Sequence, residues 1–264
     1  MKDDLPELQD PEKTLTPWQG LRRFTDARIA LGRAGTSLPT RELLKFNAAH
    51  AAARDAVHAQ GNVQDLKTEL ADLDLPILEV RSRAAHRSEY LRRPELGRSL
   101  NPEARARLEA LNLPGAPDLL IMVSDGLSAL AAQQNAGAVL HLLIPALRAR
   151  GYTLAPLLLA TQARVALADE AAELLGARLA LHLIGERPGL SSPDSLGAYL
   201  TYAPRVGTLD SMRNCLSNIR PAGLSAAWAV HKLLYLVGEA QRRQLSGVEL
   251  KDDSGDGKSA LSPG

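Results

Sequence analysis

The hydrophobic pattern changes near the middle of this 264-residue chain. From residue 116 onwards, short apolar runs of strand length alternate with longer Ala/Leu-rich segments of helical spacing. Strands are predicted at 118–124, 153–160 and 179–184, and helices at about 127–150, 166–175 and 225–244. Alternating strands and helices are typical of βαβ units. The sequence therefore predicts a Rossmann-like α/β fold with a mostly parallel sheet and flanking helices.

Residues 16–112 instead have the pattern of helices. A helix is predicted to start at Thr16-Pro17, and its apolar stripe would consist of Trp18, Leu21, Phe24 and Ile29. A second helix would be capped by Thr40, and its apolar side would consist of Leu43, Phe46, Ala53 and Val57. Residues 62–112 are polar and rich in arginine, and their elements are hard to assign. The predicted organisation is a flexible tail (1–15), a helical N-terminal domain (16–112), an α/β domain (113–250) and a disordered C-terminal tail (251–264).

Residues 186–220 interrupt this regular pattern. The apolar run at 179–184 ends in Gly-Glu-Arg-Pro-Gly, and about thirty residues rich in Gly, Pro, Ser, Asp, Asn and Arg follow. The pattern predicts a long connection, and long connections inside a compact domain usually carry function. Because open α/β sheets bind ligands at the carboxyl ends of their strands, a ligand site is predicted here.

The composition excludes several classes of protein. A net charge of +1 gives no reason to expect nucleic acid as a partner, and no apolar run reaches the roughly 20 residues of a membrane span. The single cysteine, Cys215, excludes an internal disulfide and a cysteine-based zinc site. His50, Arg54 and His58 share one predicted helical face, but a guanidinium between two imidazoles disfavours a metal ion. Patterns for dinucleotide, Walker and nucleophile-elbow sites are absent from the sequence.

Several motifs match one known family. They are ARIALGRAGTSLPTRELLKFNAAHAAARDAVH (27–58), YLRRPELGR (90–98), VSDGLSA (123–129), RVALADE (164–170), IGERPGLSSPDSLGAYLTYAP (184–204) and RNCLSNIRP (213–221). With these motifs the chain resembles the small subunit (light chain) of ethanolamine ammonia-lyase, from about Trp18 to Glu249.

The resemblance implies a function, a cofactor and a partner. The enzyme converts ethanolamine to acetaldehyde and ammonia with adenosylcobalamin, and its large subunit is a (β/α)8 barrel that carries the substrate site and the radical chemistry. The small subunit would help to enclose the cobalamin in a hexamer of heterodimers, without catalytic residues or a metal site of its own. The resemblance places its cofactor contacts on Val165, Glu186 and Cys215, in the α/β domain. It also implies a cytoplasmic location, within a bacterial microcompartment.

The histidines bear on how cobalt would be held. Some cobalamin folds supply a histidine to the cobalt from an Asp-X-His-X-X-Gly loop, and none of the six histidines here has Asp two residues before it. Cobalt is therefore expected to keep its own benzimidazole base, as the resemblance also implies. His182 lies in an apolar run and is expected to be a hydrogen-bonded core residue.

The residues by themselves leave other interpretations open. Residues 125–128 (DGLS) and 185–189 (GERPG) could contact the cofactor, or they could be ordinary strand-to-helix turns. Cys215 could be a nucleophile, although no histidine is close to it in sequence. The arginines between 81 and 98 could form a solvated charged face or could contact the large subunit.

Two classes of function remain at this stage. One is a subunit of a cobalamin-dependent lyase. The other is a stand-alone α/β enzyme with its site in the 186–220 loop, which would need a base poised beside its nucleophile. The sequence offers no such pair.

Overall fold

A computed structural model describes residues 19–25 and 27–255. The elements follow one another as η1 (Gln19–Phe24), α1 (Thr40–His58), α2 (Val63–Glu69), η2 (Ala71–Leu73), β1 (Ile77–Arg81), α3 (Arg87–Arg92), η3 (Pro94–Arg98), α4 (Pro102–Glu109), β2 (Leu119–Ser124), α5 (Ala129–Ala149), β3 (Leu157–Thr161), α6 (Leu167–Leu174), β4 (Leu179–Gly185), β5 (Leu196–Tyr202), η4 (Asp210–Met212), β6 (Arg213–Ile219), α7 (Ala226–Arg243) and η5 (Gly247–Glu249). The chain divides into two compact units, residues 1–51 and 52–264, and each is described by itself.

The first unit has few buried side chains. Its 3-10 helix η1 is shorter than the predicted helix, and the predicted start at Thr16-Pro17 with Trp18 lies outside the described residues. Helix α1 begins at Thr40, as predicted, and continues into the second unit. Leu43 is 46% exposed and Phe46 is 41% exposed, so this part of the predicted apolar side is not packed within the first unit.

The second unit is built on one six-stranded sheet with the order β1-β3-β2-β4-β5-β6. The first four of these strands are parallel neighbours, and β5 and β6 add an antiparallel edge. The three predicted strands are β2, β3 and β4, and their buried residues form the middle of the sheet. The predicted α/β class with a mostly parallel sheet is confirmed. Among the described residues, no helix has both the length and the apolar character that a membrane crossing requires.

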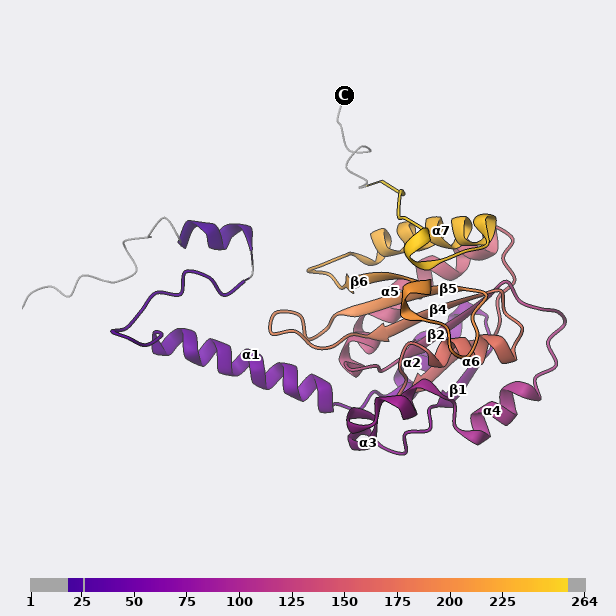
Figure 1. Cartoon of the computed structure of the whole chain (residues 1–264), viewed down its shortest axis with the longest axis horizontal. Helices are drawn as coiled ribbons and strands as arrows, with labels where there is room; N and C mark the ends of the chain where they lie inside the picture. Colours follow the sequence, from indigo (N-terminus) through magenta and orange to yellow (C-terminus); the bar gives the residue numbers. More distant parts are fainter. Residues whose placement is uncertain (1–18, 26, 256–264) are drawn as a thin grey trace, which may run out of the picture. The chain divides into compact units, whose positions relative to one another are not determined.

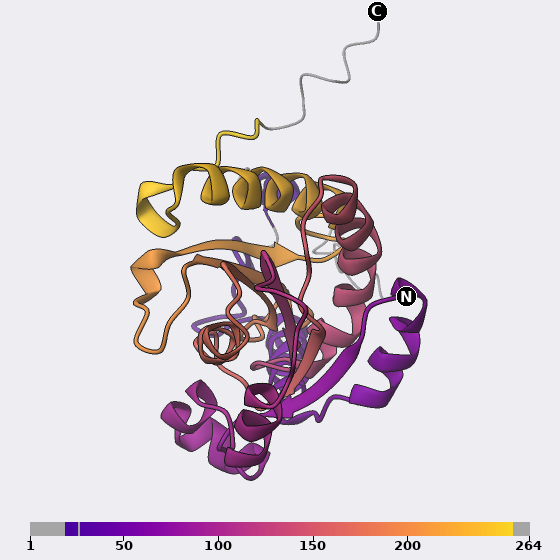
Figure 2. The ribbon, with the colours of Figure 1, turned by 90° about the vertical axis from the view of Figure 1, so that its right-hand side faces the viewer.

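The two faces of the sheet are covered differently. Helices α5 and α7 pack on one face, where the core includes side chains from β2 to β6 (Figure 1). Helices α4 and α6 pack on the other face, where the described core residues come from β1 to β4 and none comes from β5 or β6. Viewed at right angles, α7 (yellow) runs along one side of the sheet (Figure 2). On the α6 side, Arg213 of β6 is paired with Asp169 of α6, whereas the area around Tyr199 and Cys215 is not buried by these helices.

The structure corrects the prediction for residues 186–220. This segment is not one long loop, because it contains strands β5 and β6. Leu196, Ala198 and Leu200 alternate toward the α5–α7 core, while the residues between them face the other way. The glycine and the polar residues that resembled a loop belong to the open face.

Strand β1 lies within 62–112, the region that was hard to assign. It pairs with β3 along five residues, from Ile77↔Leu157 to Arg81↔Thr161. It is an edge strand in which only Val80 is fully buried, so its apolar signal is weak. The segment predicted as a helical domain thus contributes a strand to the sheet.

Candidate functional site

Two neighbouring hollows open at the carboxyl ends of the parallel strands, on the α6 side of the sheet. The first, of about 460 Å³, lies beside the end of β4 and is lined by Gly185, Glu186 and Ser217 among others. The second, of about 630 Å³, lies beside the start of α6 and η4. Arg164, Val165 and Tyr199 line both hollows. Each hollow has the size of a ligand pocket, and together they offer a broad surface rather than a deep cleft.

Val165 is held in place by the buried His182. The connection from β3 to α6 carries Val165, and its carbonyl oxygen lies 3.1 Å from Nδ1 of His182. A carbonyl can only accept, so Nδ1 carries the proton, and Nε2 accepts a hydrogen bond from the Ser124 hydroxyl at 2.7 Å. Burial lowers the pKa of His182 to about 4, which keeps the ring neutral. This histidine is the hydrogen-bonded core residue that the sequence predicts, and it positions one wall of the hollows.

Glu186 joins three strands at the edge of the first hollow. Strand β6 has a bulge opposite Gly197, and Asn218 adopts the left-handed conformation there (φ 60°). The Glu186 carboxylate accepts hydrogen bonds from the Asn218 N–H (3.2 Å), the Ser217 hydroxyl (2.6 Å) and the Ser195 hydroxyl. A carboxylate has about four acceptor positions, so these three donors leave one for a ligand.

Cys215 lies on the open face of β6, directly opposite Tyr199 of β5. Burial raises the pKa of Cys215, although the neighbouring Tyr199 opposes this effect, and burial likewise raises the pKa of Tyr199. A nucleophilic thiol needs a depressed pKa or an adjacent base, and this pair supplies neither. Cys215 is arranged as a contact residue.

The structure thus brings two of the three predicted residues together directly. Val165 and Glu186 line the same hollow, and Cys215 is connected to it through Tyr199. The sequence analysis did not single out Tyr199. The sequence pattern that could have indicated Tyr199 is the period-two alternation in LGAYLTY (196–202), which places Tyr199 on the face opposite to the leucines.

The DGLS turn (125–128) has the features of a strand-to-helix connection. Ser128 caps α5 by accepting from the Ala131 N–H at 3.2 Å. Gly126 has φ 49°, and a Cβ there would lie 2.2 Å from the Gly185 carbonyl oxygen, so only glycine lets the two loops approach this closely. Glycine at position 126 therefore serves the packing of the loop that precedes Glu186.

Asp125, the first residue of this turn, has a perturbed ionisation. Burial raises the pKa of Asp125 to about 6, although Arg87 and nearby N–H groups oppose the shift. The Arg87 guanidinium lies 3.4 Å from the Asp125 carboxylate and also donates to the carbonyl oxygens of Gly126 and Val57. The pair connects the start of α3 to the turn after β2. The Arg87–Asp125 pair therefore stabilises the structure beside the site.

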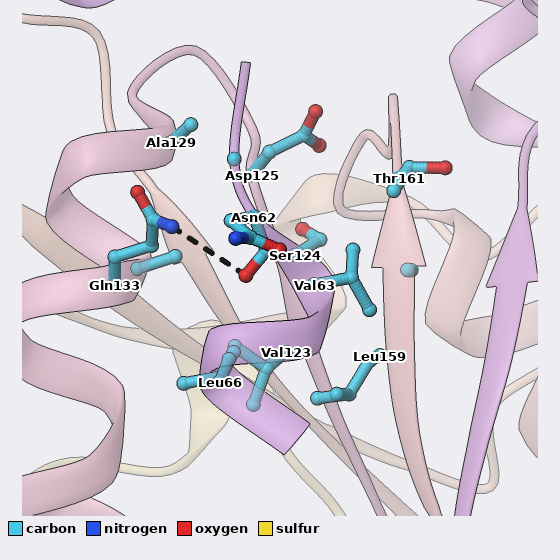
Figure 3. A pocket seen from close by; sticks show the side chains of 13 residues that line it. Asn62, Val63, Leu66, Val123, Ser124, Asp125, Ala129, Gln133, Leu159 and Thr161 are labelled. Atoms are coloured by element: carbon cyan, nitrogen blue, oxygen red, sulfur yellow. Dashed lines mark hydrogen bonds between the residues drawn. The ribbon is translucent and has the colours of Figure 1, made fainter. Parts of the chain in front are cut away.

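A third cavity lies at the same end of the sheet, between α2 and α5. Figure 3 shows Asp125, Asn62 and Gln133 around it, with apolar side chains such as Leu159 beneath. Its volume is about 30 Å³, which accommodates one or two water molecules. This cavity is therefore too small for a large ligand, whereas the two hollows on the other face are not.

A buried ion pair underlies the second hollow. The side chains of Arg213 and Asp169 are each 2% exposed, and their charged atoms are 2.6 Å apart. Arg213 also donates to the Thr201 hydroxyl and to the Thr208 carbonyl oxygen. Because Asp169 is on α6 and Arg213 opens β6, the pair fixes the helix after Val165 to the strand that carries Cys215. The sequence analysis did not single out this pair, because its two residues lie 44 positions apart in the chain.

Comparison with known proteins gives a consistent result. The family model described as "Ethanolamine ammonia-lyase light chain (EutC)" matches residues 15–251. A protein of Azotobacter vinelandii named ethanolamine ammonia-lyase small subunit is 58% identical over 243 residues, which cover 91% of this chain and 90% of the relative. Proteins of the same name from Pseudomonas syringae pv. tomato and Ralstonia nicotianae are each 54% identical over 250 residues. They cover 94% and 93% of this chain and 87% and 93% of their own lengths, respectively.

Proposed function

This chain belongs to the ethanolamine ammonia-lyase light-chain family, and we propose that it is the small subunit of an adenosylcobalamin-dependent lyase that converts ethanolamine to acetaldehyde and ammonia. Its partner in this proposal is the large subunit, with which it forms a hexamer of heterodimers. The proposed location is the cytoplasm, within a bacterial microcompartment.

The observation that carries the proposal is the pair of hollows that share Arg164, Val165 and Tyr199. Cobalamin is a large disc rimmed by amide arms, and it needs a broad surface with dispersed polar groups. The hollows, the open acceptor position on Glu186 and the exposed Cys215 fit that requirement. We assign the cofactor contacts to Val165, Glu186 and Cys215.

The proposed role of this chain is to bind and orient. When bound, adenosylcobalamin supplies the radical chemistry, for which we assign the catalytic groups to the large subunit. Glu186 accepts a hydrogen bond from an amide arm, and Val165 and Cys215 contact the corrin rim. His182 keeps Val165 in place as a neutral donor.

A stand-alone enzyme is not supported. The 186–220 segment is a pair of strands, and the partner of Cys215 is a phenol whose pKa is raised. The thiol therefore has no activated base beside it.

Reconstitution tests the proposal. The purified chain, the large subunit and the two combined are each assayed for adenosylcobalamin-dependent release of acetaldehyde from ethanolamine. We expect turnover only in the combined sample. Turnover by this chain alone would refute the proposal, and so would a large subunit whose activity does not change when this chain is added.

A further inference from the structure

Arg164 occupies a central position in the site and has no assigned role. It lies on the connection from β3 to α6, next to Val165, and lines both hollows. Its Nη2 donates to the Tyr90 carbonyl oxygen at 3.3 Å, and its Nε is buried without a hydrogen-bond partner in the described part of the chain. Nη1 has no hydrogen-bond partner in the described part of the chain and is not among the fully buried polar atoms, so it can donate to a ligand in the hollows.

The YLRRPELGR motif (90–98) forms a cradle for this arginine. The Arg164 guanidinium lies over the ring of Tyr90, 4.3 Å from its centroid, and the Tyr90 hydroxyl donates to the Ala163 carbonyl oxygen at 2.8 Å. The backbone N–H of Arg164 donates to the Gly97 carbonyl oxygen at 2.8 Å. A Cβ on Gly97 would lie 2.8 Å from Cγ of Arg164, so the glycine leaves the space that the side chain needs. The motif therefore fixes where the charge is presented.

The carboxylates around the hollows do not neutralise Arg164. Glu95 is paired with Arg93 at 2.7 Å, and Asp210 with Arg213 at 3.3 Å. The Glu186 carboxylate accepts from three neutral donors and forms no ion pair with Arg164. No carboxylate of the described residues lies within ion-pair distance of Arg164. The Arg164 guanidinium therefore presents to the hollows a positive charge that is not directly paired with a carboxylate of the described residues.

We infer that Arg164 binds the phosphodiester of the cofactor's nucleotide tail. This inference rests on the proposed function and extends it to a residue outside the three assigned contacts. The corrin ring carries neutral amide arms, whereas the tail carries a phosphate, which is the kind of group that a guanidinium binds best. The motif at 90–98 then serves to orient this guanidinium, and its arginine-rich composition does not by itself define a surface for the large subunit.

A comparison of two corrinoids separates binding of the phosphodiester by Arg164 from nonspecific electrostatic attraction. Cyanocobalamin carries the phosphodiester, and dicyanocobinamide has the same ring and amide arms without it. Equilibrium dialysis of the complex with the large subunit gives the Kd of each. For Arg164→Met we expect the Kd of cyanocobalamin to rise about 10- to 100-fold, while that of the cobinamide changes less than about threefold. Arg164→Lys keeps the charge without the planar fork and should lose an intermediate amount, about 3- to 10-fold.

Two further variants control the interpretation. Arg92→Met removes an exposed arginine of the same motif that lines neither hollow, and it should change the cyanocobalamin Kd less than about threefold. Gly97→Ala keeps every charge but displaces Arg164, so it should weaken cyanocobalamin selectively, as Arg164→Met does. Thermal melting confirms that each variant is folded, and Arg164→Gln replaces Arg164→Met if the latter is not.

The outcomes are distinct. An equal loss for both corrinoids, or an equal loss in the Arg92 variant, would overturn the phosphodiester contact. Failure of the Arg164 variants to assemble with the large subunit would show that the missing anion is a carboxylate of the partner, which also overturns it. A wild-type complex that binds neither corrinoid would refute the proposed function itself.

Discussion

Removal of Arg213 should be among the most destabilising single substitutions in this chain. Its guanidinium is 2% exposed and donates at 2.6 Å to Asp169, whose side chain is equally buried. The second carboxylate oxygen of Asp169 is buried without a partner in the described part of the chain. Arg213→Met would leave a buried carboxylate with no counter-charge, and breaking a buried pair in this way costs about 3–5 kcal/mol.

A double variant shows how much of the lost stability comes from the unpaired Asp169 carboxylate. Asp169→Leu together with Arg213→Met replaces two buried charges by apolar side chains, so most of the lost free energy of unfolding should return. The matched control is Arg93→Met, which breaks the pair of Arg93 with Glu95. Both side chains of that pair are more than half exposed, so the change should cost less than about 1 kcal/mol.

The penalty should also depend on pH. Burial raises the pKa of Asp169 even though Arg213 opposes the shift, so removal of Arg213 raises the pKa further. A carboxyl group whose folded pKa exceeds its unfolded value binds more protons when folded, and stability then falls as the pH rises. The cost of Arg213→Met should therefore be small near pH 4 and grow toward neutral pH.

Urea unfolding of the full chain, followed by circular dichroism between pH 4 and 8, measures all three variants. A loss below about 1 kcal/mol at pH 7 for Arg213→Met, or a double variant as unstable as the single one, would refute the reasoning. A penalty that grew in acid would show that Asp169 is not the group left unpaired.

Three further predictions concern the site. Burial lowers the folded pKa of His182 to about 4, so wild-type stability should fall as the pH drops from about 6.5 toward 4, by up to about 3 kcal/mol. Urea unfolding of His182→Gln should lack this component, and an unchanged pH slope would contradict it. Glu186→Gln should weaken cyanocobalamin binding about 10-fold and Cys215→Ala about fivefold, with kcat at saturating cofactor unchanged in both. Loss of kcat in Cys215→Ala would make the thiol catalytic. Because Cys215 is the single cysteine, iodoacetamide labelling followed by mass spectrometry reports on it alone. Cofactor bound to the complex should slow the labelling, and an equal rate with and without cofactor would place the thiol outside the site.

The middle of the sheet could be predicted because its strands are buried on both faces. β2, β3 and β4 consist almost entirely of buried residues, so each is a continuous apolar run in the sequence. β1 could not be predicted in this way, because as a short edge strand it buries one residue fully. Strands β5 and β6 were not predicted for another reason. One of their faces is open and carries Gly197, Tyr199 and Cys215, which gives a loop-like composition.

The site was predicted unevenly. Val165, Glu186 and Cys215 came from the family resemblance, and no spacing in the sequence connects them. Their proximity depends on the register Tyr199↔Cys215 and on the connection after β3, both of which are long-range features. The Arg164 cradle depends on contacts between residues about seventy positions apart, so the motif at 90–98 could be noticed but not interpreted.

The open face of β5 and β6 and the unpaired charge of Arg164 both favour a ligand site between the two hollows. An antiparallel edge left bare by helices would ordinarily carry solvated polar residues, and β6 carries the exposed Ser217 there. Tyr199 departs from that expectation, because it is a large aromatic residue on the bare face between two hollows. Arg164 departs from it as well, since a guanidinium that served only solubility would not be held by Tyr90 and Gly97. An aromatic platform beside a fixed cation suits a flat, largely neutral ligand that carries one anionic group. This combination supports the proposed corrinoid site with observations other than the resemblance.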